Sequence, residues 1–465
     1  KKSDRDIFQE LMPFKVKEIL LIANYYDSYT IEREGQFSDK IFGEYLQLNL
    51  YTAPRFTSVA NEEAALRALA NKHFELIIIM AGIDKTTPVA TSRSIKRLYP
   101  DIHQLMLVNN NADLAHFRRV EAETRESIER VFVWNGSTKV FLAMAKYLED
   151  KINLDVDTRL ADTRVILVVE DSIKYYSRYL PLLYTEVMTQ TQAIINEEPS
   201  NDEMGVILKM RVRPKVILVS TFEEAVDIID RYRDNIIGVI SDVRYPRGGV
   251  EDENAGIELI RHVRAFDTHV PCLLQSHERE NLRRAQETKA NFIVKNSPTL
   301  SRDIRNFIKG ELGFGDFIFR DANGLPIDRA TSVEEFRRKL MTVPDESLEY
   351  HAKRNGISTW LMARAEINLA KKLRRYSFSY FKNAEETRRF IANVFEASEL
   401  KKLRGRIINF NPLLVDSNRY ITRLGKGSLG GKGRGLAFLS NFIENVYLKK
   451  LIPDLQVMIP KTAVI

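Results

Sequence analysis

Five polar side chains follow apolar runs along the middle of the chain. Glu170 and Asp171 end the run "RVILVV", and Asp242 ends "NIIGVIS". Ser276 ends "VPCLLQ", and Lys295 ends "ANFIV". Three carboxylates in one pocket repel each other unless a cation neutralises them, and an all-oxygen site of this kind suits Mg²⁺. These residue types predict phosphoryl transfer to Asp242 as the nucleophile, with Ser276 and Lys295 stabilising the phosphate oxygens.

This chemistry needs an architecture that gathers the five residues at one edge. Valine-rich apolar runs are typical of strands buried on both faces, and helical patterns such as "AGIELIRHVRAF" fill the intervals. The alternation predicts an α/β fold with a parallel, doubly wound sheet, which binds ligands beyond the carboxyl ends of its strands. The alternative is that each acid caps a helix or meets solvent. Five residues of the right type in succession favour the site.

From about residue 160 to 312 the chain resembles the receiver domain of bacterial response regulators. The resemblance implies a flavodoxin-like, five-stranded sheet, a Mg²⁺ cofactor, and a histidine kinase or a small phosphodonor as the partner. The residues that match are the metal-binding acids Glu170, Asp171 and Asp242, the phosphoacceptor Asp242, the phosphate-stabilising Ser276 and Lys295, and the switch aromatic Phe292.

Two positions depart from the receiver pattern. His277 follows Ser276 where the family prefers a small residue that leaves room for the phosphoryl donor. The sequence "KNSP" replaces the usual lysine-proline step. These departures predict that phosphorylation of Asp242 is slow or lost.

The N-terminal part repeats the pattern without its charges. "KEILLIANYY" parallels "RVILVVEDSI", "HFELIIIMAGID" parallels "IIGVISDVRYP", and "VFVWNGS" parallels "FIVKNSP". The residues at the positions of the acid pair, the phosphoacceptor and the lysine are Ala23, Asn24, Met80 and Trp134. We therefore expect a degenerate pseudo-receiver domain over residues 1–157 and a receiver domain with a complete acidic pocket over 158–312.

Both copies carry a long first helix, around "GQFSDKIFGEYLQLNL" and "YYSRYLPLLYTEVMTQTQAIIN". Their apolar residues at helical spacing exceed what one sheet face needs. Three explanations stay open: packing within each core, pairing between the two receivers, or pairing between two chains in a homodimer.

A helical connector is expected over residues 313–410. Its separate helices are "SVEEFRRKLMTV", "SLEYHAKRNG" and "STWLMARAEINLAKKLRR", and two further helices are expected around "NAEETRRFIANVF" and "ASELKKLRGR". Thr331 and Ser332, followed by acids, suit a helix N-terminus.

The glycine-rich stretch "GSLGGKGRGLAF" near the end of the chain suggests phosphate binding. It is not a Walker A loop, because Lys432 is followed by Gly433 instead of Ser or Thr. A G-x-G-x-x-G match is present, but the following apolar run supplies no acid for a ribose hydroxyl. What remains is a flexible glycine run leading into a helix from Leu436, with its N-terminus toward phosphate and Lys432 as a point charge.

The stretches "LGGKGRGLAFLSNFI" and "IPKTAVI" resemble the opening of the ATP-grasp-like nucleotide-binding domain of the phosphoenolpyruvate synthase and pyruvate phosphate dikinase family. The resemblance implies that residues 411–465 are the truncated start of such a domain and that ATP is a cofactor of the full-length parent. It places nucleotide-binding residues at Gly430, Gly431, Lys432 and Gly433.

Taken with the receivers, this predicts the N-terminal regulatory region of a phosphotransferase, whose partner is its own C-terminal catalytic region. This chain alone is not expected to be catalytic, because the phosphohistidine and pyruvate-binding domains of the family are absent from it. The alternative is a stand-alone phosphorelay or scaffold protein without enzymatic output.

Composition sets the broad limits. Apolar residues make up 44% of the chain and charged residues 29%, which is typical of a soluble globular protein. A signal peptide and an apolar run long enough for a membrane span are both missing from the sequence, so we expect a cytoplasmic location. The net charge of +7 comes without a nucleic-acid-binding motif, and the single cysteine, Cys272, excludes a disulfide framework.

Overall fold

A computed structural model gives the conformation of most of the chain. It describes residues 9–24, 37–48, 50, 53–82, 84–109, 114, 116–117, 119, 126–196, 210–267, 270–364, 366–374, 381–403, 407–409, 421–424, 430–445 and 462–464. The chain divides into two compact units, one made of Lys1–Phe317 with Arg354–Ala370 and the other of Ile318–Lys353 with Lys371–Ile465.

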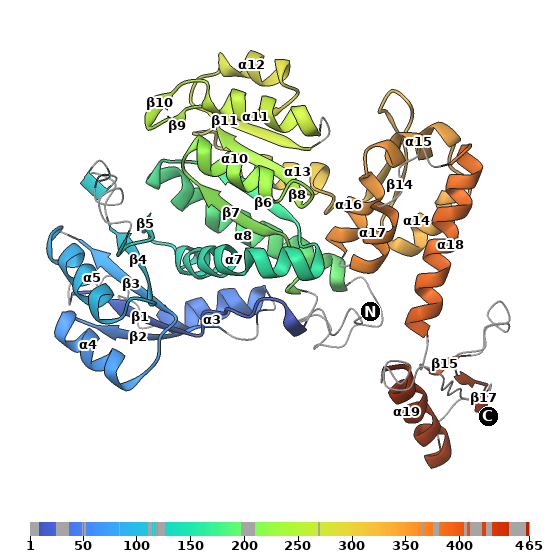
Figure 1. Cartoon of the computed structure of the whole chain (residues 1–465), viewed down its shortest axis with the longest axis horizontal. Coiled ribbons are helices and arrows are strands. Elements are labelled where there is room, and N and C mark those ends of the chain that lie inside the picture. The colour runs from blue at the N-terminus through green and yellow to red at the C-terminus, as the bar shows by residue number, and fades with distance from the viewer. Residues whose placement is uncertain are drawn as a thin grey trace. The chain divides into compact units, whose positions relative to one another are not determined.

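The first unit contains two five-stranded parallel sheets (Figure 1). The first sheet has, in spatial order, β2 (Arg55–Val59), β1 (Glu18–Ile22), β3 (Leu76–Ala81), β4 (His103–Val108) and β5 (Arg130–Val133). The helices α4 (Glu62–Asn71) and α5 (Thr87–Leu98) pack on one face, and α3 (Phe37–Gln47) and α7 (Lys139–Ala161) on the other. The central strand β3 is buried throughout because both faces are covered.

The second sheet repeats this arrangement. Its strands are β7 (Lys215–Val219), β6 (Val165–Val169), β8 (Ile236–Asp242), β11 (Cys272–Ser276) and β12 (Asn291–Val294). The helices α10 (Phe222–Arg231) and α11 (Ala255–Phe266) cover one face, and α8 (Ile173–Asn196) and α13 (Leu300–Glu311) the other. Numbered within each domain, both sheets have the flavodoxin-like order 2-1-3-4-5. The predicted fold class is confirmed.

Equivalent positions of the two sheets have equivalent backbone pairing. Val169 at the end of β6 is in register with Ser241, and Ile22 at the end of β1 is in register with Ile79. The backbone N–H of Lys295 donates to the carbonyl of Ser276 at 3.0 Å. The N–H of Trp134 donates to the carbonyl of Val108 at 2.8 Å. The internal repeat inferred from the sequence is therefore present in the strands.

A short hairpin follows β8, where the sequence predicted only a turn. The strands β9 (Tyr245–Arg247) and β10 (Val250–Asp252) pair antiparallel. Gly248 and Gly249 connect them with φ angles of +60° and +79°, a backbone region in which glycine carries no steric penalty.

The long helix α8 joins the two sheets. The hydroxyl of Tyr176 donates to the carbonyl of Val131 in β5, and the N–H of Val133 donates to the hydroxyl of Ser177 at 3.0 Å. The rings of Tyr176 and Phe132 meet edge to face with centroids 5.7 Å apart. Of the three explanations for the long first helices, pairing between the two domains is confirmed for α8.

The helix α7 carries a buried polar stripe. Asp150 accepts two hydrogen bonds from Arg213, at 2.7 and 2.9 Å, and the ammonium group of Lys215 lies 2.6 Å from Asp157. Asn153 accepts from the N–H of Phe14 at 2.9 Å. The stripe therefore connects the N-terminal segment and β7 to one helix.

The expected domain limit between residues 157 and 158 falls inside α7. The domain limits stay predictions.

The region expected as a helical connector, residues 313–410, contains strands as well as helices. A hairpin of β13 (Phe317–Arg320) and β14 (Pro326–Ala330) precedes α14 (Val333–Leu340), α15 (Asp345–Lys353) and α18 (Ala384–Leu403). The hydroxyl of Ser332 accepts from the N–H of Glu335 at 3.1 Å, so the predicted helix start is confirmed. The stretch expected as one helix is two, α16 (Gly356–Ala363) and α17 (Ile367–Arg374). The last two expected helices are instead one continuous helix, α18.

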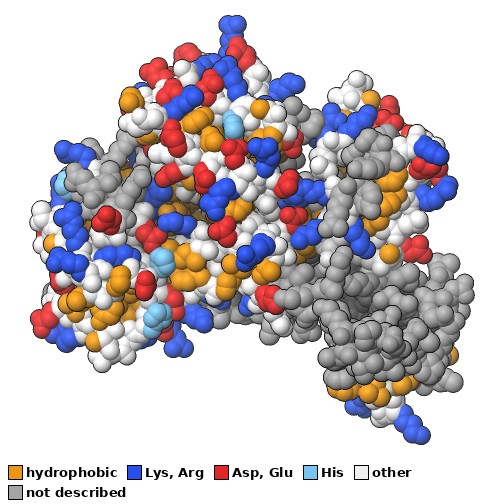
Figure 2. All heavy atoms as spheres, in the orientation of Figure 1, with side chains coloured by type: hydrophobic (Ala, Val, Ile, Leu, Met, Phe, Trp, Pro, Cys, Tyr) orange, Lys and Arg blue, Asp and Glu red, His pale blue; other side chains and the backbone are white. Residues whose placement is uncertain are grey.

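On the face shown in Figure 2, Lys and Arg side chains are interspersed with Asp and Glu side chains. Within the described ranges, no helix has both the length and the apolar character that crossing a membrane requires.

Candidate functional site

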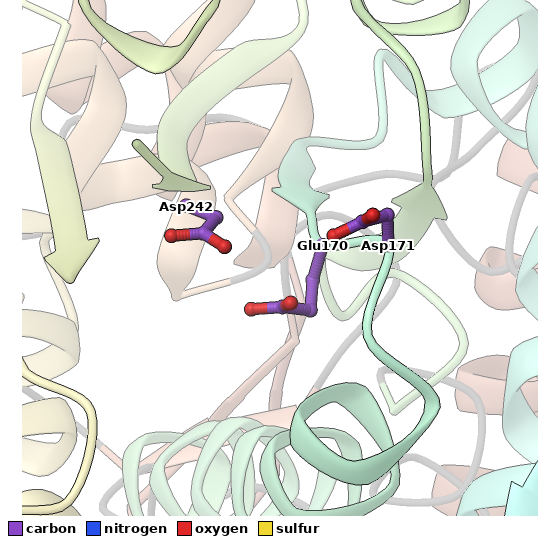
Figure 3. Close-up of side chains that lie close together, drawn as sticks. All are labelled: Glu170, Asp171 and Asp242. Carbon is purple, nitrogen blue, oxygen red and sulfur yellow. The ribbon is translucent and has the colours of Figure 1, made fainter. Parts of the chain in front are cut away.

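Three carboxylates meet at the carboxyl edge of the second sheet. Glu170 and Asp171 directly follow β6, and Asp242 is the last residue of β8, the neighbouring strand (Figure 3). One carboxylate oxygen from each lies within 4.8 Å of the others. Among the described residues, these are the ones that form a group of acid, His or Cys side chains close enough to share a metal ion. Their oxygens match the ligand preference of Mg²⁺.

Lys295 supplies the positive charge of this pocket. It follows β12, and its ammonium group lies 2.6 Å from Glu170 and 2.6 Å from Asp242. The side chains of Lys295 and Glu170 are each only 2% exposed, so these ion pairs are largely shielded from solvent. The sequence predicted that Lys295 lies at the same edge of the sheet as the acids, and its contacts with Glu170 and Asp242 agree with that prediction.

Burial and the neighbouring charges change the pKa values in the pocket. Burial raises the pKa of the Glu170 carboxyl to about 8, although the ammonium group of Lys295 opposes the shift. Burial alone would lower the pKa of Lys295, but the carboxylates of Glu170 and Asp242 outweigh it and raise the pKa. A bound cation would favour the ionised form of Glu170, so cation binding and proton release are coupled.

Ser276 lies on β11, the strand next to β8, and Phe292 lies on β12, the edge strand beside it. The hydroxyl of Ser276, at the end of β11, accepts hydrogen bonds from the N–H of Glu278 at 3.1 Å and from Asn281 at 2.9 Å. The hydroxyl is thus held by the turn that leads into α12 (Asn281–Glu287). Phe292 lies in β12 in register with Leu274 and packs, half-buried, against the core.

The backbone around Asp242 is closely packed against α11. A carboxylate oxygen of Asp242 accepts from the N–H of Val243 at 2.7 Å. A Cβ atom placed on Gly256 would lie 2.1 Å from the carbonyl oxygen of Asp242. Glycine is therefore required at the start of α11. Sequence reasoning missed this position, because a glycine near a helix start has several common explanations.

Two aromatic rings lie at the outer side of the pocket. The ammonium group of Lys295 is 4.4 Å from the ring centroid of Tyr175, and the ring of His277 lies 5.1 Å from that of Tyr175. Burial and the charge of Lys295 lower the pKa of His277. The sequence singled out His277 as an unusual residue but gave no signal for Tyr175, which resembles the other aromatics of a long helix.

The corresponding edge of the first sheet has lost the charges of the pocket. Ala23 and Met80 are buried and apolar, and Trp134 stands where the second sheet has its lysine. Asn24 is exposed. These observations agree with the description of the first domain as a degenerate copy.

The glycine stretch does not have the predicted loop structure where it is described. Residues 425–429 lie outside the described residues, and α19 (Gly431–Asn445) begins five residues before the expected start at Leu436. The N–H of Arg434 donates to the carbonyl of Gly430 at 3.0 Å, so a helical turn includes Lys432 and Gly433. The prediction of a flexible run at 431–435 was wrong, because helical hydrogen bonding extends over these glycines. The side chain of Lys432 is exposed.

Three short strands between residues 407 and 464 form a small parallel sheet. It contains β15 (Ile407–Asn409), β16 (Ile421–Arg423) and β17 (Thr462–Val464), and most of the expected nucleotide-binding segment between them lies outside the described residues. The four proposed nucleotide-binding residues stay a prediction.

Neither a family model nor a curated protein matches this chain. Among solved structures, full-length ShkA in complex with AMPPNP is 14% identical, with 65% of this chain and 52% of that chain covered and a TM-score of 0.20. NtrX from Brucella abortus in complex with ADP is 9% identical, with 82% and 100% covered and a TM-score of 0.24. The GsuK channel is 12% identical, with 64% and 71% covered and a TM-score of 0.18. The chain spans about half of the ShkA chain.

Proposed function

We propose that the second α/β domain is a receiver that accepts a phosphoryl group at Asp242 in a Mg²⁺-dependent reaction. The observation that supports this most is the position of Lys295, whose ammonium group lies 2.6 Å from both Glu170 and Asp242 beside a third carboxylate, Asp171. Acids grouped with a buried lysine at the carboxyl edge of a parallel sheet are arranged to hold a cation and phosphate oxygens together.

Each residue has a distinct role in the proposed reaction. The oxygen of Asp242 attacks the phosphorus atom of the donor, and the bond between phosphorus and the donor's leaving group breaks, with its electron pair going to that group. Glu170 and Asp171 would hold Mg²⁺ together with Asp242, and the bound ion would neutralise charge on the phosphoryl oxygens. Lys295 turns from its carboxylate partners to a phosphate oxygen. The hydroxyl of Ser276 donates a hydrogen bond to another oxygen of the phosphoryl group.

The phosphoryl donor is a histidine kinase or a small phosphodonor. To test the function, the purified chain is incubated with Mg²⁺ and acetyl phosphate and its intact mass is measured. The expected result is a gain of one phosphoryl group that is stable in acid, labile in base, and absent in Asp242→Asn. A parent that never gains mass, or a variant that still gains it, would overturn the assignment.

We further propose that this receiver regulates a phosphoenolpyruvate synthase or pyruvate phosphate dikinase-like phosphotransferase. The support is the resemblance of the stretch that includes Gly430–Gly433, together with the exposed Lys432 in the first turn of α19. The test is the reading frame after the codon for Ile465. Several hundred further residues with a phosphohistidine motif agree with this proposal, whereas a stop codon there favours the stand-alone signalling or scaffold protein.

A further inference from the structure

We propose that the first domain supplies a positioning residue, Arg130, to the Mg²⁺ site of the second domain. Arg130 holds the hydroxyl of Ser220, and this hydroxyl holds the backbone of Glu170, one of the three acids. The inference rests on the Mg²⁺ binding that belongs to the proposed function. It gives the degenerate domain a part in the reaction of its neighbour, although its own pocket has lost its charges.

The two domains contact each other along the free edge of β5. The other edge of this strand pairs with β4, so the backbone groups of the free edge need partners outside the sheet. Helix α8 of the second domain supplies them. The hydroxyl of Tyr176 donates to the carbonyl of Val131, and the hydroxyl of Ser177 accepts from the N–H of Val133 at 3.0 Å. The strand that carries Arg130 is therefore held against the second domain.

Arg130 extends from β5 to the carboxyl edge of the second sheet. Its guanidinium group donates to the hydroxyl of Ser220 at 2.6 Å. The central carbon of this group lies 5.6 Å from the ring centroid of Tyr176 and 5.8 Å from that of Tyr147, and both tyrosines are buried. Cation–π contacts at these distances favour one position of the guanidinium group. The donor of the hydrogen bond to Ser220 is thus held in place.

Ser220 binds the backbone of Glu170 from the neighbouring strand end. It directly follows β7, which pairs with β6, and Glu170 directly follows β6. The hydroxyl of Ser220 donates to the carbonyl of Glu170 at 3.3 Å, and the N–H of Glu170 donates to the carbonyl of Val219 at 3.1 Å. The N–H of Ser220 donates to Glu224 at 2.9 Å. Both backbone polar groups of Glu170 are therefore bound to residues 219 and 220.

The direction of the Ser220 hydroxyl depends on Arg130. A serine hydroxyl has one proton to donate and accepts through its lone pairs. Because Arg130 donates to the hydroxyl oxygen, the proton is directed to the carbonyl of Glu170. Without the guanidinium group the hydroxyl is free to turn to solvent, and Glu170 loses one of its two backbone contacts. Groups that orient a metal ligand in this way contribute to metal affinity without touching the ion.

The experiment uses the full chain and measures Mg²⁺ affinity by calorimetry, together with the Mg²⁺ concentration that gives half-maximal labelling of Asp242 by acetyl phosphate. Arg130→Ala and Ser220→Ala should each weaken Mg²⁺ binding about fivefold and shift the half-maximal concentration equally, because each disturbs the same hydrogen bond to Glu170. The double variant should bind no more weakly than either single variant. At saturating Mg²⁺ the labelling rates should equal that of the parent.

Two further variants serve as controls. Ser220→Thr keeps the hydroxyl and should bind Mg²⁺ like the parent. Ser177→Ala removes a hydrogen bond of the same domain interface, to the N–H of Val133, and should leave Mg²⁺ affinity unchanged. Ser220→Ala removes only a half-buried hydroxyl, so it tests the link even if Arg130→Ala does not fold. If Ser177→Ala weakens binding as much as Ser220→Ala does, or if the effects of the Arg130 and Ser220 substitutions add, the proposal is wrong.

The two proposals fail separately. If Asp242 is labelled but Arg130→Ala and Ser220→Ala bind Mg²⁺ like the parent, the role of Arg130 is wrong and the phosphoacceptor assignment stands. If the variants lose Mg²⁺ affinity as expected but no chain is labelled, phosphoryl transfer to Asp242 is wrong and the role of Arg130 in the cation site stands. A parent chain that does not bind Mg²⁺ would overturn both.

Discussion

The ammonium group of Lys295 lies 2.6 Å from a carboxylate oxygen of Asp242, and at the same distance from Glu170. In this arrangement a side chain of the protein neutralises acids that are proposed to bind a divalent cation. Lys295 and the cation therefore both neutralise the same carboxylates. The stability of the domain, its Mg²⁺ affinity and its reactivity should all depend on this lysine.

Removal of the lysine charge should make the domain dependent on a cation. Lys295→Met leaves the buried Glu170 and the half-buried Asp242 without their partner and is expected to lower the free energy of unfolding by about 3 kcal/mol at pH 9 without divalent ions. Urea denaturation with and without Mg²⁺ measures this, and Mg²⁺ should stabilise the variant more than the parent. Lys309, an exposed residue of α13, provides the control, since Lys309→Met should change stability by about 0.5 kcal/mol or less. Equal behaviour of the two variants would argue against the role of Lys295.

Mg²⁺ affinity should increase with pH. Burial raises the pKa of Glu170 to about 8, so below that pH the carboxyl holds a proton that a cation must displace. Affinity should be roughly thirtyfold weaker at pH 6.5 than at pH 9 and should level off above about pH 8, with release of about one proton per ion at neutral pH. Calorimetry in buffers of different ionisation enthalpy measures both quantities. A flat profile in the parent would contradict the burial effect, and Glu170→Gln should lose the pH dependence in this range.

The close approach of α11 to Asp242 predicts a strong effect of one methyl group. In Gly256→Ala the new Cβ would lie 2.1 Å from the carbonyl oxygen of Asp242, so the helix or the strand end must move. We expect a loss of about 2 kcal/mol in stability and slower labelling of Asp242.

A second glycine supplies the matched control. Gly310 lies in α13, and a Cβ placed there meets nothing within 4 Å. Gly310→Ala should therefore stabilise the chain by about 0.5–1 kcal/mol through helix propensity alone. If thermal denaturation shows the same change for both glycine variants, the packing of α11 does not constrain Asp242.

The buried stripe on α7 should contribute far more to stability than surface ion pairs do. In Arg213→Met, Lys215 is the cation that still pairs with Asp150 and Asp157 among the described residues, and the change should cost about 3–5 kcal/mol. Arg231 pairs with Asp227 and Asp155 at the surface, and Arg231→Met should cost about 0.5 kcal/mol or less. Urea midpoints of the two variants test the difference. Equal midpoints would mean that the buried ion pairs add no net stability.

The sequence was sufficient for the sheets and most of the site because both depend on local patterns. An apolar run that ends in Asp242 specifies a buried strand and places its acid at the carboxyl edge, and parallel pairing then brings Lys295 to the same edge. The internal repeat added the same prediction for the first domain.

The features that the sequence did not reveal depend on contacts between distant segments. Tyr175 contacts Lys295 only because the start of α8 lies near the end of β12. The residues around Tyr175 in the sequence do not indicate this contact. Arginine and lysine side chains usually lie in solvent, yet Arg213 and Lys215 are both buried against α7. The glycines at the start of α19 predicted a loop, but helical hydrogen bonding there outweighs their low helix propensity.

The central claim is tested most directly by locating the phosphoryl group. After incubation with Mg²⁺ and acetyl phosphate, borohydride reduces an aspartyl phosphate to homoserine, and peptide mass spectrometry identifies the position. The account predicts homoserine at position 242, dependent on Mg²⁺, and none at the described acids of the first domain. Homoserine elsewhere, or unreduced Asp242 in a chain that has gained a phosphoryl group, would contradict it.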